Sequence, residues 1–307
     1  MILEWIAKET GVGAAQIATI VRSANNRYCT YSIPKRDGTP RQISQPSKKL
    51  KFVQRWLAKR VFVNLPVHKS ATAYLPGVGI RKNALEHASS KYLLKMDMSD
   101  FFPSIREEDI VKLMLLNSEK WAGFEDADAN FIGKAVSYRG ALTIGAPSSP
   151  VLSNAILFEF DELVHEYCIN NELVYSRYAD DISISSKGRI DLHAVSGVVE
   201  EFVQKLETPK LNINREKTVI VSKKHQRFIT GLNLTSDGNV SVGRLRKREI
   251  RTLIFKFKSA DLDFSEIGYL KGWMAYLNAV EPSFVERARL KYGDRTVQKI
   301  FEYDVDG

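Results

Sequence analysis

Cysteine is scarce in this sequence, and long apolar runs are missing from it. The 307 residues include two cysteines, Cys29 and Cys168, whose separation matches neither a metal-binding pattern nor a disulfide framework. No apolar run reaches the ~18 residues that a membrane-spanning helix needs. The first residues, MILEWIAKETG, contain Glu4 and Lys8 and no small-residue cleavage site, which is not typical of a signal peptide. We therefore expect a cytoplasmic protein with no membrane partner.

Several common catalytic motifs are also absent. The five histidines are scattered and lack HExxH spacing, and the phosphate-binding loop GxxxxGK[ST] does not occur. No Ser/His/Asp or Cys/His arrangement stands out, and neither does an internal repeat. These absences leave nucleophilic and zinc-based catalysis without candidate residues.

The composition is that of a basic globular protein. With 44% hydrophobic and 10% aromatic residues, the chain can bury a full-sized core. Lysine and arginine number 45 against 36 acidic residues, which gives a net charge of +9. A basic surface suits a polyanionic partner, because each neutralised phosphate releases counterions. Many proteins are basic without such a partner, so charge alone does not decide.

Periodicity and turn residues predict an α+β fold, in which helices pack on one face of a sheet. The expected elements, in chain order, are two short helices in 1–24 separated at Gly11–Gly13, a hairpin in 28–45 with turn residues Pro34 and Asp37-Gly38, a basic helix after Pro46, a strand in 91–98, a helix opened by Pro147–Pro150, strands on either side of Ala179-Asp180, and a helix-rich tail from Gly243 divided by Pro282.

Two of these expectations concern burial patterns. Ile182 and Ile184 alternate with two serines, which predicts a half-buried strand. The helix after Pro147 is expected to continue to Tyr167, because one apolar stripe runs along it. The stripe consists of Leu152, Ile156, Phe160, Leu163 and Tyr167.

Three aspartates are the strongest candidates for a catalytic site. Asp180 and Asp181 are adjacent at the predicted turn in YSRYADDISIS, and Asp97 ends the predicted strand KYLLKMDM. A doubled aspartate at a turn is more often structural. If strand ends of one sheet bring the three together, however, their carboxylates raise one another's pKa values unless a cation neutralises them. Mg²⁺ prefers such oxygen ligands, and two ions ~3.5–4 Å apart can clamp a phosphoryl displacement.

Four ordered blocks resemble the reverse transcriptase family. They are Lys95–Ile105 (KMDMSDFFPSI), Gly145–Asn154 (GAPSSPVLSN), Tyr178–Asp181 (YADD) and Asn214–Thr218 (NREKT). The resemblance implies a right-hand polymerase that makes DNA on an RNA template from dNTPs with two Mg²⁺ ions. It also implies N-terminal helices and fingers in 1–90, a palm with a fingers insertion in 91–242, and a helical thumb in 243–307.

Within that family the sequence is most similar to the bacterial retron class. Asn83–His87 fits the NAxxH signature, Phe228–Gly231 is similar to the VTG signature, and Arg41–Trp56 resembles the N-terminal fingers block. The resemblance implies a structured noncoding RNA of msr–msd type as partner and template, and branched msDNA as product. It further implies phage defence with an effector protein of the same operon, and trimming of the RNA by host RNase H. One departure is Ile144, where many relatives have glutamine.

The resemblance also assigns roles to single residues at the catalytic centre. Asp97, Asp180 and Asp181 would be catalytic and would hold Mg²⁺ together with the Met98 carbonyl. The expected nucleotide-binding residues are Arg41, Phe101, Phe102, Gly145 and Lys217. Phe102 fits a ring under the nucleotide sugar, with a core aromatic as the alternative, and for Phe101 the core aromatic is the preferred interpretation. Lys217 is as compatible with an exposed turn lysine as with a triphosphate contact.

RNA binding is expected at two places outside the catalytic centre. The residues concerned are Asn83, His87, Thr230, Gly231, Arg244, Lys247, Arg248 and Arg251. Asn83 and His87 lie i, i+4 on a predicted helix, and a structural histidine is the ordinary alternative there. Residues 243–258 hold seven basic side chains, and the four that are named above are expected to point outward from the helix. A solvated charged face is the alternative there to a phosphate-tracking thumb helix.

Two rival functions stay open from the sequence. One is another bacterial reverse transcriptase, of the abortive-infection or diversity-generating type. The other is an RNA-binding scaffold that does not polymerise, for which Ile144 is the hint.

Overall fold

The computed structural model of the chain describes residues 1–35 and 38–304. The chain forms two compact units: the first consists of 1–76, 94–183 and 191–219, and the second of 77–93, 184–190 and the remainder from Ile220. Within the described ranges, no helix combines the length and the apolar character needed to cross a bilayer. The three-part division at residues 90 and 242 stays a prediction.

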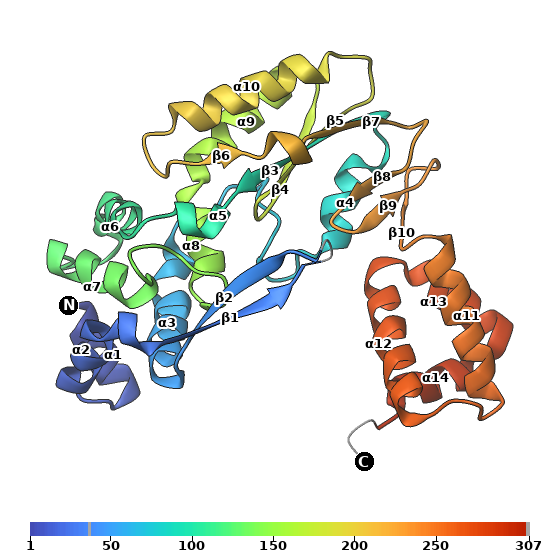
Figure 1. Cartoon of the computed structure of the whole chain (residues 1–307), viewed down its shortest axis with the longest axis horizontal. Coiled ribbons are helices and arrows are strands. Elements are labelled where there is room, and N and C mark those ends of the chain that lie inside the picture. The colour runs from blue at the N-terminus through green and yellow to red at the C-terminus, as the bar shows by residue number, and fades with distance from the viewer. Residues whose placement is uncertain (36–37, 305–307) are drawn as a thin grey trace. The chain divides into compact units, whose positions relative to one another are not determined.

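Helices dominate the beginning of the first unit (Figure 1). They are α1 (Ile2–Thr10), α2 (Ala14–Arg22), the short η1 (Ala24–Arg27), α3 (Lys48–Arg60) and η2 (Phe62–Asn64). The predicted break between α1 and α2 is confirmed, because Gly11 ends α1 in the left-handed conformation with φ 70°. The predicted basic helix is α3, and the Ser47 side chain caps it by accepting a hydrogen bond from the Leu50 N–H.

More helices of the first unit pack beside this group. They are α6 (Glu107–Leu116), η3 (Ser118–Lys120) and α7 (Asp126–Val136). Helix α7 contacts α2, α3 and α6, so that the N-terminal helices share one core with it. The buried side chains include Ile17, Leu57 and Ile132.

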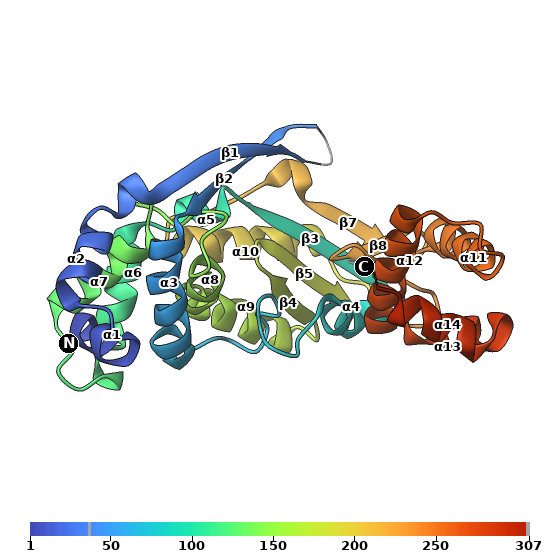
Figure 2. The same cartoon turned by 90° about the horizontal axis from the view of Figure 1, so that it is seen from below.

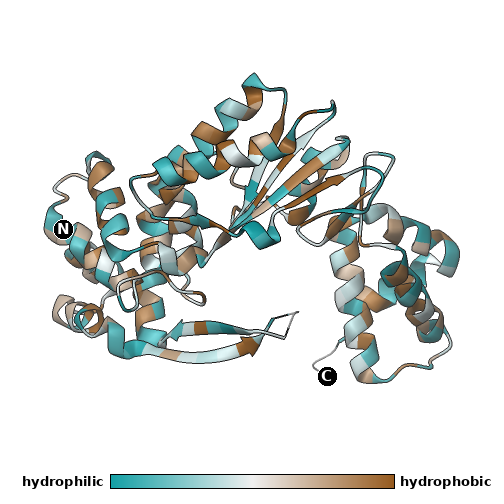
Figure 3. Ribbon diagram, turned by 45° about the horizontal axis from the view of Figure 1, so that its top comes forward, coloured by the Kyte–Doolittle hydropathy of each residue, from teal (hydrophilic) through white to brown (hydrophobic). Residues whose placement is uncertain are grey.

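Strands β1 (Tyr28–Pro34) and β2 (Pro40–Pro46) form the predicted antiparallel hairpin, in which Ile33 pairs with Arg41. Asp37 of the predicted turn lies outside the described residues. Figure 2 shows the hairpin as a long ribbon that leads away from α2 and α3. In Figure 3 it carries mixed colours, whereas hydrophobic colour concentrates on the strands of the central sheet. Nearly all of β1 is exposed, so contacts within the hairpin hold it more than a core does.

A second sheet forms the centre of the fold. Its strands follow the order β4 (Val174–Tyr178), β5 (Asp181–Ser186), β3 (Tyr92–Ser99) and β6 (Asn212–Ile213), and β7 (Val219–Ser222) also pairs with β3. Helices α9 (Phe158–Asn170) and α10 (Leu192–Lys205) lie side by side against it (Figure 1). The predicted α+β arrangement is confirmed.

The structure corrects two burial predictions. The helix after Pro147 is not continuous, because α8 (Ser149–Ile156) ends before Leu157 and α9 begins after it. The buried face of α9 differs from the predicted stripe, so that Leu163 is 40% exposed. Strand β5 is covered on both faces rather than one, because its serines are buried as well as its isoleucines, and His87 Nδ1 lies 2.7 Å from Ser185 Oγ.

The second unit has a small sheet and a helical bundle. Helix α4 (Ile80–Ala88) packs on β8 (Arg227–Ile229), β9 (Leu232–Leu234) and β10 (Val240–Ser241). The predicted helix-rich tail is confirmed, and Pro282 occupies the first turn of one of its helices. The helices that share its core are α11 (Arg244–Lys258), α12 (Phe264–Val280), α13 (Pro282–Tyr292) and α14 (Asp294–Glu302).

Candidate active site

The three aspartates lie together at one end of the central strands. Strand β4 ends at Tyr178 and β5 begins at Asp181, so Ala179 and Asp180 form the two-residue connection between them. Asp97 comes from the neighbouring strand β3, and the next residue, Met98, donates its backbone N–H to the Asp180 carbonyl oxygen over 3.1 Å. Residues far apart in the chain therefore meet at one point.

Asp180 has an acidic neighbourhood that favours its protonated form. Burial raises the pKa of its carboxyl group, and the negative charge of Asp97 raises it further. The positive charges of Lys217 and Arg41 act in the opposite direction but do not cancel these effects. A cation near Asp180 would therefore be stabilised by this site.

Asp181 is affected in the same way. Burial raises the pKa of its carboxyl group, and the charges of Asp180 and Asp97 add to that increase. Lys95 lies two residues before Asp97 on β3, and its positive charge lowers the pKa of Asp181. The charge of Asp97 therefore acts on both residues of the turn.

Lys217 supplies a positive charge directly to this cluster. It lies in the short helix η4 (Arg215–Lys217), and its Nζ donates a hydrogen bond to Asp97 Oδ1 over 2.8 Å. This hydrogen bond raises the pKa of the Lys217 ammonium group. The lysine side chain is 59% exposed, so it can leave Asp97 without opening the core. The structure thus ties the predicted lysine to the predicted aspartate.

Replacing Lys217 by methionine is expected to shift the acidic limb of the pH–rate profile to higher pH. The lysine charge lowers the pKa values of Asp180 and Asp181, so its loss lets both carboxylates protonate at a higher pH. Because Lys217 is exposed, the free energy of unfolding should change by no more than about 0.5 kcal/mol. Steady-state primer extension between acidic and neutral pH measures the shift. Lys205→Met, which removes another exposed ion-paired lysine, is the matched control, and an equal profile for both variants would contradict the assignment.

The acidic cluster has the ligand chemistry of a metal site. Within 1–35 and 38–304, no group of three or more His, Cys, Asp and Glu side chains is arranged to hold a metal as it stands. The donor chemistry nevertheless fits, because burial and the charge of Asp97 raise the pKa values of Asp180 and Asp181, and a hard divalent cation would offset the clustered negative charge. The Lys217 ammonium on Asp97 shows that a positive group is accommodated at this position.

Gly145 holds the loop before α8 close against strand β2. Its φ of 112° is a conformation that residues with a side chain rarely adopt, and a Cβ there would lie 3.1 Å from the Ser44 carbonyl oxygen. The Ser44 N–H donates to the Ile144 carbonyl oxygen over 2.9 Å, so Ile144 supports β2 through its backbone, whatever its side chain. Arg41 extends from this strand, and its charge reaches Asp180.

Gly145→Ala is expected to destabilise the protein by about 1–3 kcal/mol and to lower polymerase activity, because β2 must move away from the new methyl group. Chemical denaturation and primer extension measure the two effects. Gly11→Ala is the control, since Gly11 also has a positive φ but no atom of residues 1–35 or 38–304 lies within 4 Å of its Cβ position. If both variants behave alike, the close approach to β2 has no role.

Phe101 and Phe102 have different environments in the short helix α5 (Phe101–Ser104). Phe101 is 4% exposed and belongs to the core, as the preferred interpretation had it, and it is therefore removed from the predicted nucleotide contacts. Phe102 is half-buried, and its ring centroid lies 5.2 Å from that of Phe101. Only Phe102 keeps a surface that a nucleotide can contact.

Asn83 and His87 are core residues of α4. They are 1% and 0% exposed, and burial lowers the pKa of the His87 imidazole to about 3. His87 Nδ1 lies 2.7 Å from Ser185 Oγ, which in turn donates to Ser90 Oγ. The structure supports the structural alternative for both residues, and direct RNA contact by them is no longer proposed.

Thr230 and Gly231 form the connection between β8 and β9. Both have positive φ values, 47° and 82°, which this two-residue hairpin turn requires. Among the described residues, no atom lies within 4 Å of a Cβ built on Gly231, so within the protein the glycine serves the turn conformation. Gly231 is exposed and remains accessible to a ligand.

The basic residues of α11 differ in exposure. Arg244, Arg248 and Arg251 are exposed, as predicted. The Lys247 side chain is only 17% exposed and forms an ion pair with Glu281 over 2.7 Å, because it faces α12 and α13 rather than solvent. Its predicted outward orientation is wrong.

Sequence reasoning missed several residues of the site. The charge of Lys95 lowers the pKa of Asp181. Burial and the charge of Asp180 raise the pKa of Tyr74, whose φ is 63°. Arg177 is fully buried beside the turn. A charged residue inside the strand VYSRY was the available signal, because a charge within a central strand requires a partner.

Known proteins resemble this chain over most of its length. The family described as reverse transcriptase (RNA-dependent DNA polymerase) matches residues 33–234. The retron Ec83 reverse transcriptase of Escherichia coli is 36% identical over 288 residues, covering 91% of this chain and 91% of that protein. The retron Ec86 reverse transcriptase of Escherichia coli is 27% identical over 306 residues, covering 96% of this chain and 91% of that protein.

A solved structure agrees in fold alone. Apo telomerase from Candida tropicalis superposes with a TM-score of 0.50 at 11% identity, covering 89% of this chain and 61% of that chain.

The chain therefore belongs to the reverse transcriptase family, with a right-hand polymerase fold and RNA-directed DNA polymerase activity. Within the family it groups with the bacterial retron reverse transcriptases, as the NAxxH signature and the VTG-like Phe228–Gly231 predicted.

Proposed function

We propose that this reverse transcriptase copies part of its own structured noncoding RNA, of msr–msd type, into a branched msDNA. The observation that carries the proposal is the meeting of Asp97 with the Asp180-Asp181 turn in a chain that is 36% identical to a retron enzyme over 91% of its length. Synthesis would start from a 2′-hydroxyl of the RNA and consume dNTPs.

Asp97, Asp180 and Asp181 are proposed to hold magnesium, with the Met98 carbonyl as a further ligand. When bound, two Mg²⁺ ions would activate the attacking hydroxyl and stabilise the departing pyrophosphate. The support from this chain is the electrostatic coupling of the carboxylates, which disfavours three unneutralised charges.

Arg41 and Lys217 are proposed to bind the triphosphate of the incoming dNTP. The charges of both lower the pKa of Asp180, so both lie within electrostatic range of the reacting centre. Arg41 offers a planar fork that suits phosphate oxygens. Lys217 would exchange its hydrogen bond with Asp97 for the phosphates, and its exposed side chain permits this movement. Phe102 would lie under the sugar, and Gly145 would keep β2 in place.

Partners and location follow from the same proposal. The exposed Arg244, Arg248 and Arg251 of α11 are proposed to contact RNA or hybrid phosphates, and Thr230-Gly231 to contact the noncoding RNA. We further propose a cytoplasmic ribonucleoprotein that acts in phage defence with an effector protein of the same operon. Trimming of the template is assigned to host RNase H.

Isolation of the nucleic acid that copurifies with the protein tests this function. The protein is expressed together with the DNA that flanks its gene, and the nucleic acid is treated with RNase, debranching enzyme and DNase before sequencing. The proposal predicts DNA joined covalently to an RNA 2′-oxygen. DNA without such a branch would match another type of bacterial reverse transcriptase, and RNA without DNA would match a scaffold that does not polymerise.

A further inference from the structure

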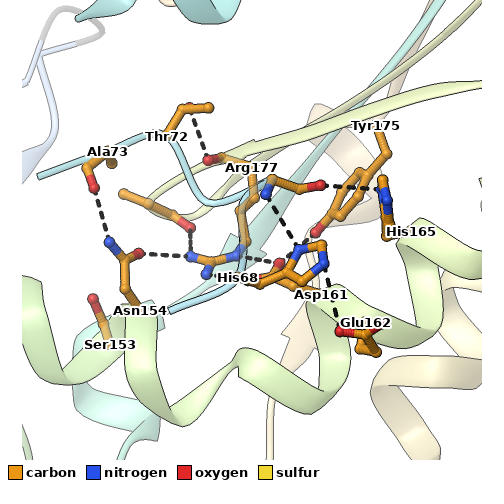
Figure 4. A network of polar contacts seen from close by, with 12 residues as sticks. His68, Thr72, Ala73, Ser153, Asn154, Asp161, Glu162, His165, Tyr175 and Arg177 are labelled. Carbon is orange, nitrogen blue, oxygen red and sulfur yellow. Dashed lines mark hydrogen bonds and ion pairs between the residues drawn. The ribbon is translucent and has the colours of Figure 1, made fainter. Parts of the chain in front are cut away.

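A buried ion pair lies directly behind the catalytic turn. Arg177 of β4 and Asp161 of α9 are both 0% exposed (Figure 4). The arginine Nε donates to Asp161 Oδ1 over 2.8 Å and its Nη2 donates to Oδ2 over 2.6 Å, which is a two-point contact. Tyr175 donates its hydroxyl to Asp161 Oδ1 over 2.6 Å, so the pair is also hydrogen-bonded on that side.

The third nitrogen of the same guanidinium group reaches the turn itself. Arg177 Nη1 donates to the carbonyl oxygen of Ala179 over 2.9 Å, and the Asn154 Oδ1 accepts from it over 3.3 Å. Ala179 is buried and has φ 57°, a left-handed conformation that alanine adopts only when its surroundings impose it. The residue that follows is Asp180. The guanidinium group therefore fixes the peptide from which the catalytic carboxylate extends.

Asn154 extends this network to a second segment. Its Nδ2 donates to the Ala73 carbonyl oxygen over 2.8 Å, as Figure 4 shows. Ala73 directly precedes Tyr74. The backbone of Arg177 also holds this segment, because Thr72 donates both its N–H and its hydroxyl to the Arg177 carbonyl oxygen over 2.8 Å and 3.0 Å. The segment beside the active site and the turn thus share one buried anchor.

Packing alone does not require the buried Arg177–Asp161 ion pair. Two charges lose their hydration when they are buried, and apolar side chains of similar volume often replace a buried ion pair without loss of stability. Burial opposes the charge of Arg177, but Asp161 raises its pKa, so the guanidinium remains charged and keeps its five donors. Five fixed donors set directions in space, which apolar packing does not do.

We propose that Arg177, held by Asp161 and Asn154, is a positioning residue that fixes the Ala179 carbonyl and thereby aims Asp180 at the reacting atoms. The inference rests on the polymerase part of the proposed function and not on msDNA synthesis. It predicts that loss of the network lowers kcat strongly and leaves the KM for dNTP nearly unchanged, because none of these residues contacts the nucleotide. It also predicts weaker metal binding, because Asp180 is no longer held in one orientation.

The main test replaces the network by apolar groups, so that no buried charge remains unpaired. The variant combines Arg177→Met, Asp161→Leu and Tyr175→Phe. Single-nucleotide extension on a generic RNA template with a DNA primer should show a kcat lowered by roughly 10²-fold, with the KM for dNTP within about threefold of wild type. Mn²⁺ binding to the protein alone, followed by electron paramagnetic resonance, should weaken as well. A folded triple variant with wild-type kcat and Mn²⁺ affinity overturns the proposal.

Two further variants decide the matter if the triple variant does not fold. Arg177→Lys retains the charge beside Asp161 but lacks the fork, so kcat should stay low although the ion pair is preserved. Asn154→Ala should lower kcat less than Arg177→Lys does. Wild-type kcat for Arg177→Lys would overturn the proposal. Asp128→Asn, which removes the ion pair with the N-terminal amine, is the control and should lower the melting temperature with no effect on kcat.

These measurements separate the two levels of inference. They use a generic primer–template, so they do not depend on the RNA that the protein binds in its cell. A protein that extends primers but yields no branched DNA would refute the retron proposal and leave the positioning role of Arg177 intact.

Discussion

The double variant Asp180→Asn with Asp181→Asn is expected to fold and to make no detectable cDNA. Both substitutions keep the size and the hydrogen-bonding shape of the side chain but remove the charges that would hold magnesium. The loss should be at least ~10³-fold in the rate of nucleotide incorporation, or about 4 kcal/mol of transition-state stabilisation. RNA-templated primer extension with radiolabelled dNTP measures it over this range.

The stability of this variant separates a catalytic defect from a folding defect. Burial and neighbouring carboxylates raise the pKa values of Asp180 and Asp181 above the ordinary value of 3.8. A carboxyl group with a raised pKa destabilises the folded state when it is ionised, and the effect disappears as the pH falls through the raised pKa toward 3.8. Without magnesium at neutral pH, the double variant should therefore melt at or above the wild-type temperature.

Asp191→Asn is the matched control for these substitutions. Asp191 caps α10 through its side chain, and asparagine caps helices equally well, so both stability and activity should remain at the wild-type level. Ordinary primer extension by the Asp180/Asp181 double variant would remove these residues from the catalytic centre.

Phe102→Val is expected to admit ribonucleotides. Phe102 is half-buried on α5, five residues after Asp97, and its ring would occupy the space beside the sugar of the incoming nucleotide. Valine leaves room for a 2′-hydroxyl, so the preference for dNTP over rNTP should fall by roughly 10- to 100-fold. The measurement is kcat/KM for a matched pair of dNTP and rNTP on one primer–template.

Phe101→Leu provides the comparison, because Phe101 is a buried neighbour with the same side chain. It should lose about 1–2 kcal/mol of stability through poorer packing, with unchanged sugar discrimination. If Phe102→Val discriminates as well as wild type, the ring has no part in sugar selection.

Local sequence patterns predicted the elements that depend on near neighbours. Gly11 and Gly13 separate α1 from α2, and β-prone residues on either side of turn signals predicted the β1–β2 hairpin. The break at Leu157 was missed, since an apolar stripe does not reveal that a helix ends and a new one begins. The burial of both faces of β5 was missed because its serines read as solvent-facing, whereas His87 of α4, distant in sequence, covers Ser185.

The part of the site that could be predicted is the part that depends on residue type alone. Asp97, Asp180 and Asp181 could be selected because a polymerase needs carboxylates at strand ends. Helical spacing could place Asn83 and His87 on one face of α4 but could not show that this face is covered. In the same way, the partner that turns Lys247 inward, Glu281, is distant in sequence. Tertiary contacts, not local pattern, decide these cases.

The central claim is that Asp97 and the Asp180-Asp181 turn act as one magnesium-dependent centre. Incorporation of a single dNTP on an RNA template, measured against Mg²⁺ concentration for wild type and Asp97→Asn, tests it most directly. Incorporation by wild type should rise with Mg²⁺ concentration, and Asp97→Asn should incorporate no nucleotide at any concentration. An Asp97→Asn enzyme with the wild-type rate and the same Mg²⁺ dependence would contradict it.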